Sequence, residues 1–276
     1  MPTYLDRILL AHRAGVAADR RPIDELVAAA RGVAEPTRGF ARELRAQTGV
    51  GVIAEIKRRS PSRGALAAEL DPASLARSYD DGGAACLSVL TDGEFFGGSA
   101  GDLVDTRAAV DLPVLRKDFT VGPADVCDGR VMGADAVLLI AAALSPQELA
   151  ELLALATEVG LDALVEVHDE AEAEAALAGG ATLIGVNQRD LVTFEVDTTR
   201  AERVVAALPD TVVRVAESGI RNAEDVARLG DAGYDAVLVG EALITAADPT
   251  AALRLLRSGA VRSSAVQSGA VDRASA

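Results

Sequence analysis

The sequence predicts an α/β fold, a closed (β/α)8 barrel of the TIM-barrel type preceded by an N-terminal helical extension. A short phrase, glycine followed by small or polar residues and a β-branched apolar run, recurs along the chain. The apolar runs alternate with segments of helical spacing, which is typical of a parallel sheet covered by helices. Eight such units within about 210 residues fit a closed barrel. A doubly wound open sheet is the alternative, but its glycine fingerprints, GxGxxG and GxxxxGK[ST], do not occur.

The first 48 residues precede the predicted barrel. Apolar residues recur at helical spacing within 4–20, and segments 23–30 and 40–47 also have helical character. We expect these helices to pack on the barrel, where they could cover one mouth. His12 is expected to lie on the surface of the first helix.

Eight strands are expected. Five follow the glycine phrase, because glycine after a helix marks its C-terminus and the apolar run that follows suits a strand buried on both faces. The five phrases are GGAACLSVL, GADAVLLI, GLDALVEV, GGATLIGV and GYDAVLVG, beginning at Gly82, Gly133, Gly160, Gly179 and Gly233. The other three strands are expected at 50–56, 112–115 and 211–216.

Helices are expected between the strands. Segment 145–159 is the clearest, since a Ser-Pro start precedes an apolar stripe. The others are expected at 72–81, 102–110, 123–132, 169–178, 200–207, 222–230 and 249–256. We therefore divide the chain into the extension (1–48), the barrel (49–258) and a tail (259–276), which lacks period and bulk and is expected to be disordered.

Composition and charge exclude several classes of protein. The chain of 276 residues has 27 Lys and Arg against 42 Asp and Glu, a formal charge of −15, and a pI near 4.6. It therefore lacks the basic face needed for nucleic acid or anionic lipid. No apolar run reaches the roughly 18–20 residues of a membrane span. Cys86 and Cys127 lie in neither a CxxC nor a CxH spacing, so we predict no disulfide framework or zinc site but two buried thiols in a soluble cytoplasmic protein.

Charged residues stand where the predicted strands end, which is where such barrels place their chemistry. Glu55 ends the first strand, and Lys57, two positions further, lies on the same side. The other strand-end groups are Arg116 to Phe119, Glu166 with His168, Asn187 to Asp190, Glu217 to Gly219, and Gly240 with Glu241. Interleaved lysines and glutamates can keep each other ionised. An ion-pair ring for stability alone would not need charges from five strands, because buried pairs seldom add net stability.

An anion site is predicted beside these charges. Ser218-Gly219 and Gly240 follow the seventh and eighth strands just before helices, and the loop after the first strand reads RRSPSRG (58–64). Glycine after strands seven and eight lets backbone N–H groups face a ligand, the usual phosphate site of such barrels. Glu241 lies next to this site, so we expect its side chain to point away.

Seven motifs, taken in order, resemble the indole-3-glycerol phosphate synthase family over nearly the whole chain. They are VIAEIKRRSPSRG (52–64), SVLTDGEFFGGS (88–99), PVLRKDF (113–119), LVEVH (164–168), IGVNQRDL (184–191), AESGI (216–220) and VLVGEAL (237–243). The resemblance implies a (β/α)8 barrel with an N-terminal helical extension. It also implies ring closure of 1-(2-carboxyphenylamino)-1-deoxy-D-ribulose 5-phosphate to indole-3-glycerol phosphate, with release of CO2 and water, in tryptophan biosynthesis. A small anionic sugar phosphate would be the partner, no cofactor or metal is implied, and a monomer is expected.

The same resemblance assigns roles to residues. Lys117 would be the general acid, its pKa tuned by neighbouring charges toward the working range, and Glu166 the general base. Glu55, Lys57, Asn187, Glu217 and Ser218 would complete the catalytic mouth. Lys57 could bind the substrate carboxylate, protonate the departing hydroxyl, or do both. The residues implied in substrate binding are Arg189, Phe95, Phe119, Leu138 and Leu191, and those at the phosphate are Ser60, Gly219 and Gly240. His168 is expected at the rim, behind Glu166.

One segment departs from the family, and two other functions are considered. Residues 124–130 lack the aromatic-Gln-Ile-x-Glu-Ala-Arg phrase that is usual after KDF, but they belong to a helix outside the mouth. Another phosphate-binding barrel enzyme, such as phosphoribosylanthranilate isomerase, would pair an Asp with a Cys where this chain has Lys117, Glu166 and Glu217. A non-catalytic barrel that binds a sugar phosphate would have lost a strand-end Lys or Glu, and none is missing.

Overall fold

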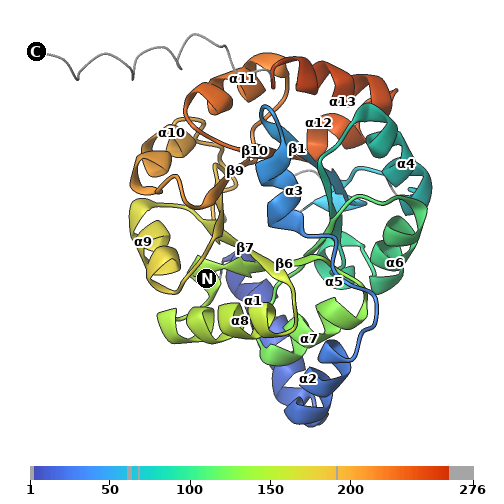
Figure 1. Cartoon of the computed structure of the whole chain (residues 1–276), viewed down its shortest axis with the longest axis vertical. Coiled ribbons are helices and arrows are strands. Elements are labelled where there is room, and N and C mark those ends of the chain that lie inside the picture. Colours follow the sequence, from blue (N-terminus) through green and yellow to red (C-terminus); the bar gives the residue numbers. More distant parts are fainter. Residues whose placement is uncertain (1–2, 61–63, 68, 191, 261–276) are drawn as a thin grey trace, which may run out of the picture.

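The barrel predicted from the sequence is confirmed. The computed structural model describes residues 3–60, 64–67, 69–190 and 192–260. Among these residues, eight parallel strands close into a barrel in the order β1-β10-β9-β8-β7-β6-β5-β4 (Figure 1). The strands are β1 (Gly51–Ile56), β4 (Cys86–Leu90), β5 (Val114–Lys117), β6 (Ala136–Ile140), β7 (Asp162–Val167), β8 (Leu183–Asn187), β9 (Val213–Glu217) and β10 (Ala236–Val239).

Helices surround the strands. The main ones are α4 (Pro72–Gly82), α6 (Ala100–Ala109), α7 (Pro123–Val131), α8 (Pro146–Glu158), α9 (Glu170–Ala178), α10 (Arg200–Val204), α11 (Ala223–Asp231) and α13 (Pro249–Ser258). Most begin at a side chain that accepts a backbone N–H of the first turn, as an N-cap does. These caps are Asp71, Ser99, Ser145, Asp169, Asn222 and Asp248.

Several short elements in the loops were not expected from the sequence. They are the hairpin β2 (Arg59–Ser60) and β3 (Gly64–Ala65), the helical turn α5 (Gly93–Phe96) and the 3-10 turn η1 (Ala141–Ala143). By contrast, the 3-10 turn η2 (Val205–Ala207) ends the helix predicted at 200–207, and α12 (Glu241–Ile244) is the helix expected after Gly240. The hairpin, α5, η1 and α12 directly follow barrel strands, so they contribute to the same end of the barrel. No helix among the described residues has both the length and the apolar character needed to span a bilayer.

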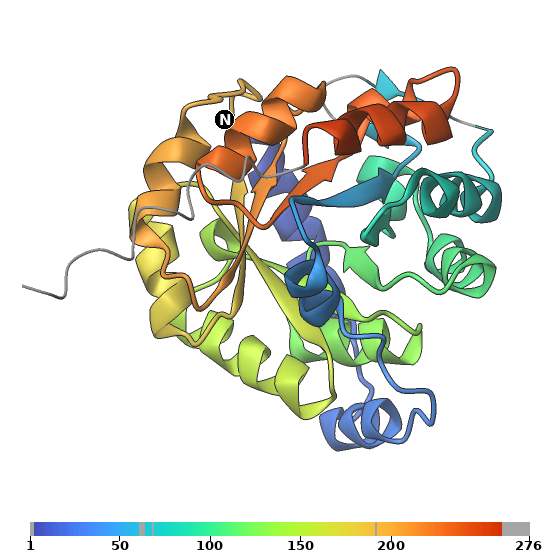
Figure 2. The ribbon, with the colours of Figure 1, turned by 45° about the horizontal axis from the view of Figure 1, so that its top comes forward.

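The N-terminal helices contact both ends of the barrel. Helix α3 (Phe40–Ala46) places Phe40 and Leu44 in one apolar cluster with the barrel interior, including Ile53 and Leu164. It therefore plugs the amino end. Helix α1 (Tyr4–Ala18) lies behind the barrel in Figure 1, at the opposite end from α3, while α2 (Ile23–Arg31) packs against α7 (Figures 1 and 2). Helices from the segment that precedes the first strand in the sequence therefore contact both ends of the barrel.

Two strands begin two residues later than predicted, while the other six lie close to their predicted positions. Pro113 has no backbone N–H, although its carbonyl accepts from Leu87 N, and β5 begins at the next residue, Val114. Strand β9 follows a turn in which Val212 N donates to Pro209 O. Both predicted thiols are buried. Residues 261–276 of the predicted tail lie outside the described residues, and the domain boundary at residue 48 stays a prediction.

Candidate active site

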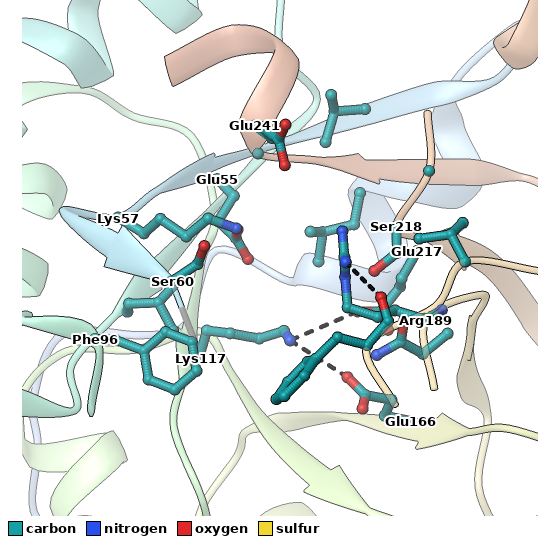
Figure 3. Close-up of a pocket in the computed structure, with 18 of the residues that line it drawn as sticks. Glu55, Lys57, Ser60, Phe96, Lys117, Glu166, Arg189, Glu217, Ser218 and Glu241 are labelled. Carbon is teal, nitrogen blue, oxygen red and sulfur yellow. Dashed lines mark hydrogen bonds and ion pairs between the residues drawn. The ribbon is translucent and has the colours of Figure 1, made fainter. Parts of the chain in front are cut away.

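A cavity of about 880 Å³ opens at the carboxyl ends of the strands. Glu55, Lys117, Glu166, Asn187 and Glu217 reach it from five different strands, because side chains at equivalent strand ends converge when a parallel sheet closes (Figure 3). The N-terminal helix α1 adds to the wall with Tyr4, Leu5 and Ile8. Residues far apart in the chain therefore share one chamber that is large enough for a small molecule.

Lys117 is the centre of an ion-pair cluster in this cavity. Its Nζ donates to Glu166 Oε2 at 3.3 Å and lies 3.6 Å from Glu217 Oε2, and both carboxylates are almost wholly buried. Lys57 pairs with Glu55 on the first strand. Glu217 Oε1 is buried and has no hydrogen-bond partner among the described residues. Three glutamate side chains and two lysine ammonium groups thus lie close together in one cavity.

Burial and neighbouring charges shift the pKa values of Glu166 and Glu217 in opposite directions. Burial alone would raise the pKa of Glu166, but the charges of Lys117 and His168 and a hydrogen bond from Asn187 lower that pKa below its usual range. Burial raises the pKa of Glu217 to about 8, with help from the neighbouring glutamates and against Lys117. At neutral pH the cluster therefore contains an ionised Glu166 and a Glu217 that largely keeps its proton. Two carboxyl groups on one lysine are thereby set up as a base and an acid.

His168 supports Glu166 from the side away from Lys117. Its Nε2 lies 3.6 Å from Glu166 Oε1, and its Nδ1 lies 3.1 Å from Glu172 Oε2. Burial lowers the pKa of His168, but the bond to Glu172 and the charge of Glu166 raise the pKa above its usual value. The imidazole beside the ionised Glu166 therefore binds a proton more readily than an ordinary histidine.

Two glycines leave room for the carboxylates. A Cβ on Gly185 in β8 would overlap the Glu217 carboxylate, and a Cβ on Gly240 after β10 would overlap that of Glu55. Glycine permits such close approach because it has no side chain. The glycine of the predicted anion site is therefore also required by the neighbouring ion pair.

The loop after β9 has an uncommon backbone. Ser218 has φ +67°, a left-handed conformation that a non-glycine residue rarely adopts, and Gly219 follows with φ +73°. The buried Gln188 side chain donates from Nε2 to Ser218 O at 2.7 Å. Gln188 thus fixes the turn that brings Ser218 and Gly219 to the cavity wall.

Sequence comparisons give the family. The family model for "Indole-3-glycerol phosphate synthase" matches residues 5–256. A relative with that name from Mycolicibacterium smegmatis is 51% identical over 253 residues, covering 91% of this chain and 92% of its own. Relatives from Mycobacteroides abscessus (251 residues) and Mycobacterium tuberculosis (252 residues) are each 49% identical, with the same two coverages. The chain belongs to the indole-3-glycerol phosphate synthase family.

Solved structures share the fold of this family member. Thiamine phosphate pyrophosphorylase from Pyrococcus furiosus superposes with a TM-score of 0.58 at 18% identity, covering 77% of this chain and 95% of its own. N-acetylmannosamine-6-phosphate 2-epimerase from Clostridium perfringens gives 0.56 at 15% identity, covering 70% and 86%. At these identities the likeness concerns the barrel alone.

The structure brings together nearly all the residues that the family resemblance singles out. Those that line the cavity are Glu55, Lys57, Ser60, Lys117, Phe119, Leu138, Glu166, Asn187, Arg189, Glu217, Ser218, Gly219 and Gly240. Phe95 does not line it; this side chain packs against Tyr4, and Phe96 faces the cavity instead. Leu191 lies outside the described residues. Adjacent phenylalanines in a four-residue helix point different ways, which the sequence alone did not resolve.

Three expectations about individual side chains were wrong. Lys117 does not have a pKa drawn down toward neutrality: burial acts in that direction, but Glu166, Glu217 and Glu55 together raise its pKa above the usual value. Glu241 does not avoid the anion site, since it lines the cavity. His12 is not a surface residue, because it bonds to Asp92 and its side chain is only 21% exposed.

Sequence reasoning missed the walls contributed by loops and by the extension. Tyr4, Leu5, Ile8, Phe96 and Phe194 line the cavity, and Gln188 holds the loop after β9 from behind. The only available signal was the helical period of the extension, which indicated that it could cover a mouth but not which residues would face inward.

Proposed function

We propose that the chain closes the indole ring of 1-(2-carboxyphenylamino)-1-deoxy-D-ribulose 5-phosphate, releasing CO2 and water to give indole-3-glycerol phosphate. The observation that carries this proposal is Lys117 held between Glu166 and Glu217 at the catalytic end of a barrel from this family. In the first step an aromatic carbon attacks the substrate ketone, whose oxygen needs a proton. Lys117 supplies it, since its raised pKa keeps the ammonium charged.

The charge of the cavity suits the next intermediate. Bond formation at the ring carbon leaves positive charge on the anilino system, and the carboxylates around Lys117 and Lys57 stabilise that charge. Loss of CO2 then restores the aromatic ring of the substrate.

The last step removes the hydroxyl as water. Glu166 has a lowered pKa and is ionised at neutral pH, so it accepts the proton. The leaving oxygen is protonated by an acid in the same cavity, for which Glu217 with its pKa of about 8 and Lys57 are both placed. Lys57 also remains available to the substrate carboxylate.

The remaining walls suit the two ends of this substrate. Phe96, Phe119 and Leu138 provide apolar surface for the anilino ring. Ser60, Gly219 and Gly240 stand at loops after β1, β9 and β10, where a phosphate can meet backbone N–H groups. Arg189 is also in the cavity wall and is our candidate for the substrate carboxylate.

The test is direct. Purified protein mixed with the anilino-ribulose phosphate should generate indole fluorescence and an equal amount of CO2. A parallel assay with phosphoribosylanthranilate should give no turnover. Absence of indole fluorescence where a control synthase is active would reject the proposal and favour a barrel that only binds a sugar phosphate. We also expect a monomer acting in the cytoplasm, which light scattering and cell fractionation would test.

A further inference from the structure

We infer that His12 is a positioning residue for substrate binding: its contacts with Asp92 and Asp118 clamp helix α1 to the loops after β4 and β5, so that α1 forms one wall of the cavity. This inference rests on the proposed function for the identity of the substrate. Tyr4, Leu5 and Ile8 of α1 line the cavity, while His12 lies further along the same helix. Helix α1 therefore carries both the wall and the clamp.

The clamp contacts two acidic groups from separate strands. His12 Nε2 lies 2.9 Å from Asp92 Oδ2 and 3.9 Å from Asp118 Oδ1, and both carboxylates are nearly buried. The imidazole ring also packs against Phe119, with the ring centroids 5.4 Å apart. A bond from a cationic imidazole to a buried carboxylate is among the stronger side-chain interactions. His12 thus ties the N-terminal helix to the ends of β4 and β5 together.

Each acidic partner also orients a cavity residue. Asp92 Oδ1 accepts from the backbone N–H groups of Phe95 and Phe96, at 2.6 and 3.0 Å, and so caps α5. Asp118 directly follows Lys117, and its Oδ1 accepts from Phe119 N at 2.8 Å. Phe96 and Phe119 both line the cavity, and their ring centroids lie 6.1 Å apart. Displacement of His12 would therefore disturb both the part of the cavity wall that α1 provides and the apolar surface formed by Phe96 and Phe119.

The surroundings of His12 favour its charged form. The bond to Asp92 raises the pKa of His12, burial opposes it, and Asp118 and Asp125 of α7 raise it further. Arg116 is the cation on this side, and it is engaged by Asp118 at 3.0 Å. Because the pKa is raised by folding, the clamp is complete below the ordinary histidine pKa of 6.5 and is lost as the pH rises through the raised value.

The next residue on the helix offers a matched control. Arg13 pairs with Glu148 of α8 at 2.9 Å, through side chains that are 43% and 37% exposed. An exposed pair of this kind contributes little, and the other bond of Arg13, from Nη2 to Ala143 O at 2.8 Å, ties α1 to η1 after β6 rather than to the loops after β4 and β5. Arg13 and His12 thus differ in the direction they face and in burial, although they are neighbours on one element.

The experiment compares wild type with His12→Gln, Asp92→Asn and the double variant. Asparagine at position 92 keeps the oxygen that caps α5 and replaces the carboxylate oxygen that faces His12 with an amide N–H group, which cannot accept from the imidazole. We expect each single variant to raise KM about tenfold, the factor that one charged hydrogen bond contributes, with kcat within about twofold. The double variant should be no worse than either single one. Amide exchange in the first turns of α1 should become faster in all three, while Arg13→Gln should leave KM unchanged.

The pH profile separates a clamp from a general loss of structure. The ratio of KM between His12→Gln and wild type should fall as the pH rises, because the wild type loses its clamp while Glu217 titrates in both proteins. An unchanged KM and unchanged exchange in His12→Gln, or additive effects in the double variant, would overturn the inference. Because amide exchange needs no turnover, it tests the clamp even if wild type forms no indole, an outcome that would reject only the proposed function.

Discussion

The two ends of the barrel bury charge in opposite ways. At the amino end Asp135 is wholly buried, and its carboxylate accepts from Arg38 N at 2.6 Å, Arg107 Nη1 at 2.6 Å and Val114 N at 2.8 Å. At the carboxyl end Glu217 Oε1 and His168 Nε2 are buried without a hydrogen-bond partner among the described residues. One cluster has its bonds filled by the protein itself, and the other has unfilled positions.

The difference teaches what each cluster does. A fully bonded buried carboxylate fixes structure, and Asp135 indeed joins the segment before α3 to the starts of β5 and β6. An incompletely bonded cluster has a free-energy cost, which a bound substrate or a moving proton can offset. Substitutions should therefore separate stability from activity according to the end of the barrel at which they lie.

The largest effect is expected from Lys117→Met. Turnover should fall by about 10²–10⁴-fold, because a general acid commonly contributes that much, while the thermal transition should move little. Steady-state indole fluorescence and thermal unfolding followed by circular dichroism would measure the two. Near-normal turnover would show that Lys117 is not part of the mechanism and that the carboxyl end of the barrel is not specialised for activity as proposed.

The reverse pattern is expected from Asp135→Ala. Loss of one partner from a buried, bonded pair leaves Arg107 without its partner and should lower the free energy of unfolding by about 3–5 kcal/mol. The kcat of the protein that remains folded should stay within about twofold of wild type. Urea unfolding and active-site-normalised kinetics would measure this, and a kcat loss comparable to that of Lys117→Met would contradict it.

A smaller effect is expected from Ser60→Ala, which tests whether the phosphate-binding residues of the cavity act separately from the ion-pair cluster around Lys117. KM and the inhibition constant of inorganic phosphate should rise together by several-fold, about the value of one hydrogen bond to a charged group, with kcat retained. Ser258→Ala, at the exposed end of α13, is the matched control. Gly240→Val is a poorer test, since its Cβ would displace Glu55. Unaltered phosphate inhibition would move the anion site elsewhere.

The smallest effect is expected from Glu217→Gln, and it concerns stability. A pKa raised to about 8 means that the folded state holds a proton which the unfolded carboxyl group releases, so stability falls as the pH rises toward that value. Glutamine removes this penalty, and Tm at pH 8–9 should rise by about 2–4 °C, the shift that about 1 kcal/mol produces in a chain of this size. At pH 4 the two proteins should melt alike. Parallel Tm profiles across this range would show that the charge of Glu217 costs nothing.

The sequence predicted the barrel and the ends of its strands because both depend on local patterns. Strand ends can be read from apolar runs, and closure brings equivalent ends together whatever the loops do. His12 and Phe96 could not be placed, since their orientation depends on how α1 and α5 dock onto the barrel. Two of the repeated phrases, GADAVLLI and GYDAVLVG, share an aspartate in the sequence, but its role could not be predicted. Asp135 accepts from Val114 N, the first residue of β5, and Asp235 accepts from Arg214 N, the second residue of β9. These contacts follow from strand order rather than from spacing.

The pairing of β1 with β10 makes the order of synthesis consequential. Glu55 and Lys57 leave the ribosome with the first strand, whereas Gly240 follows the last, which bonds to β1 from Gly51↔Ala236 to Ala54↔Val239. At the usual pace of translation this interval is on the order of ten seconds or more. During that time the first strand has one unpaired edge, a template for wrong partners. A chain terminated before β10 would keep that edge of β1 unpaired and would lack Gly240 of the anion site. The barrel must therefore close before the protein can bind and convert its substrate.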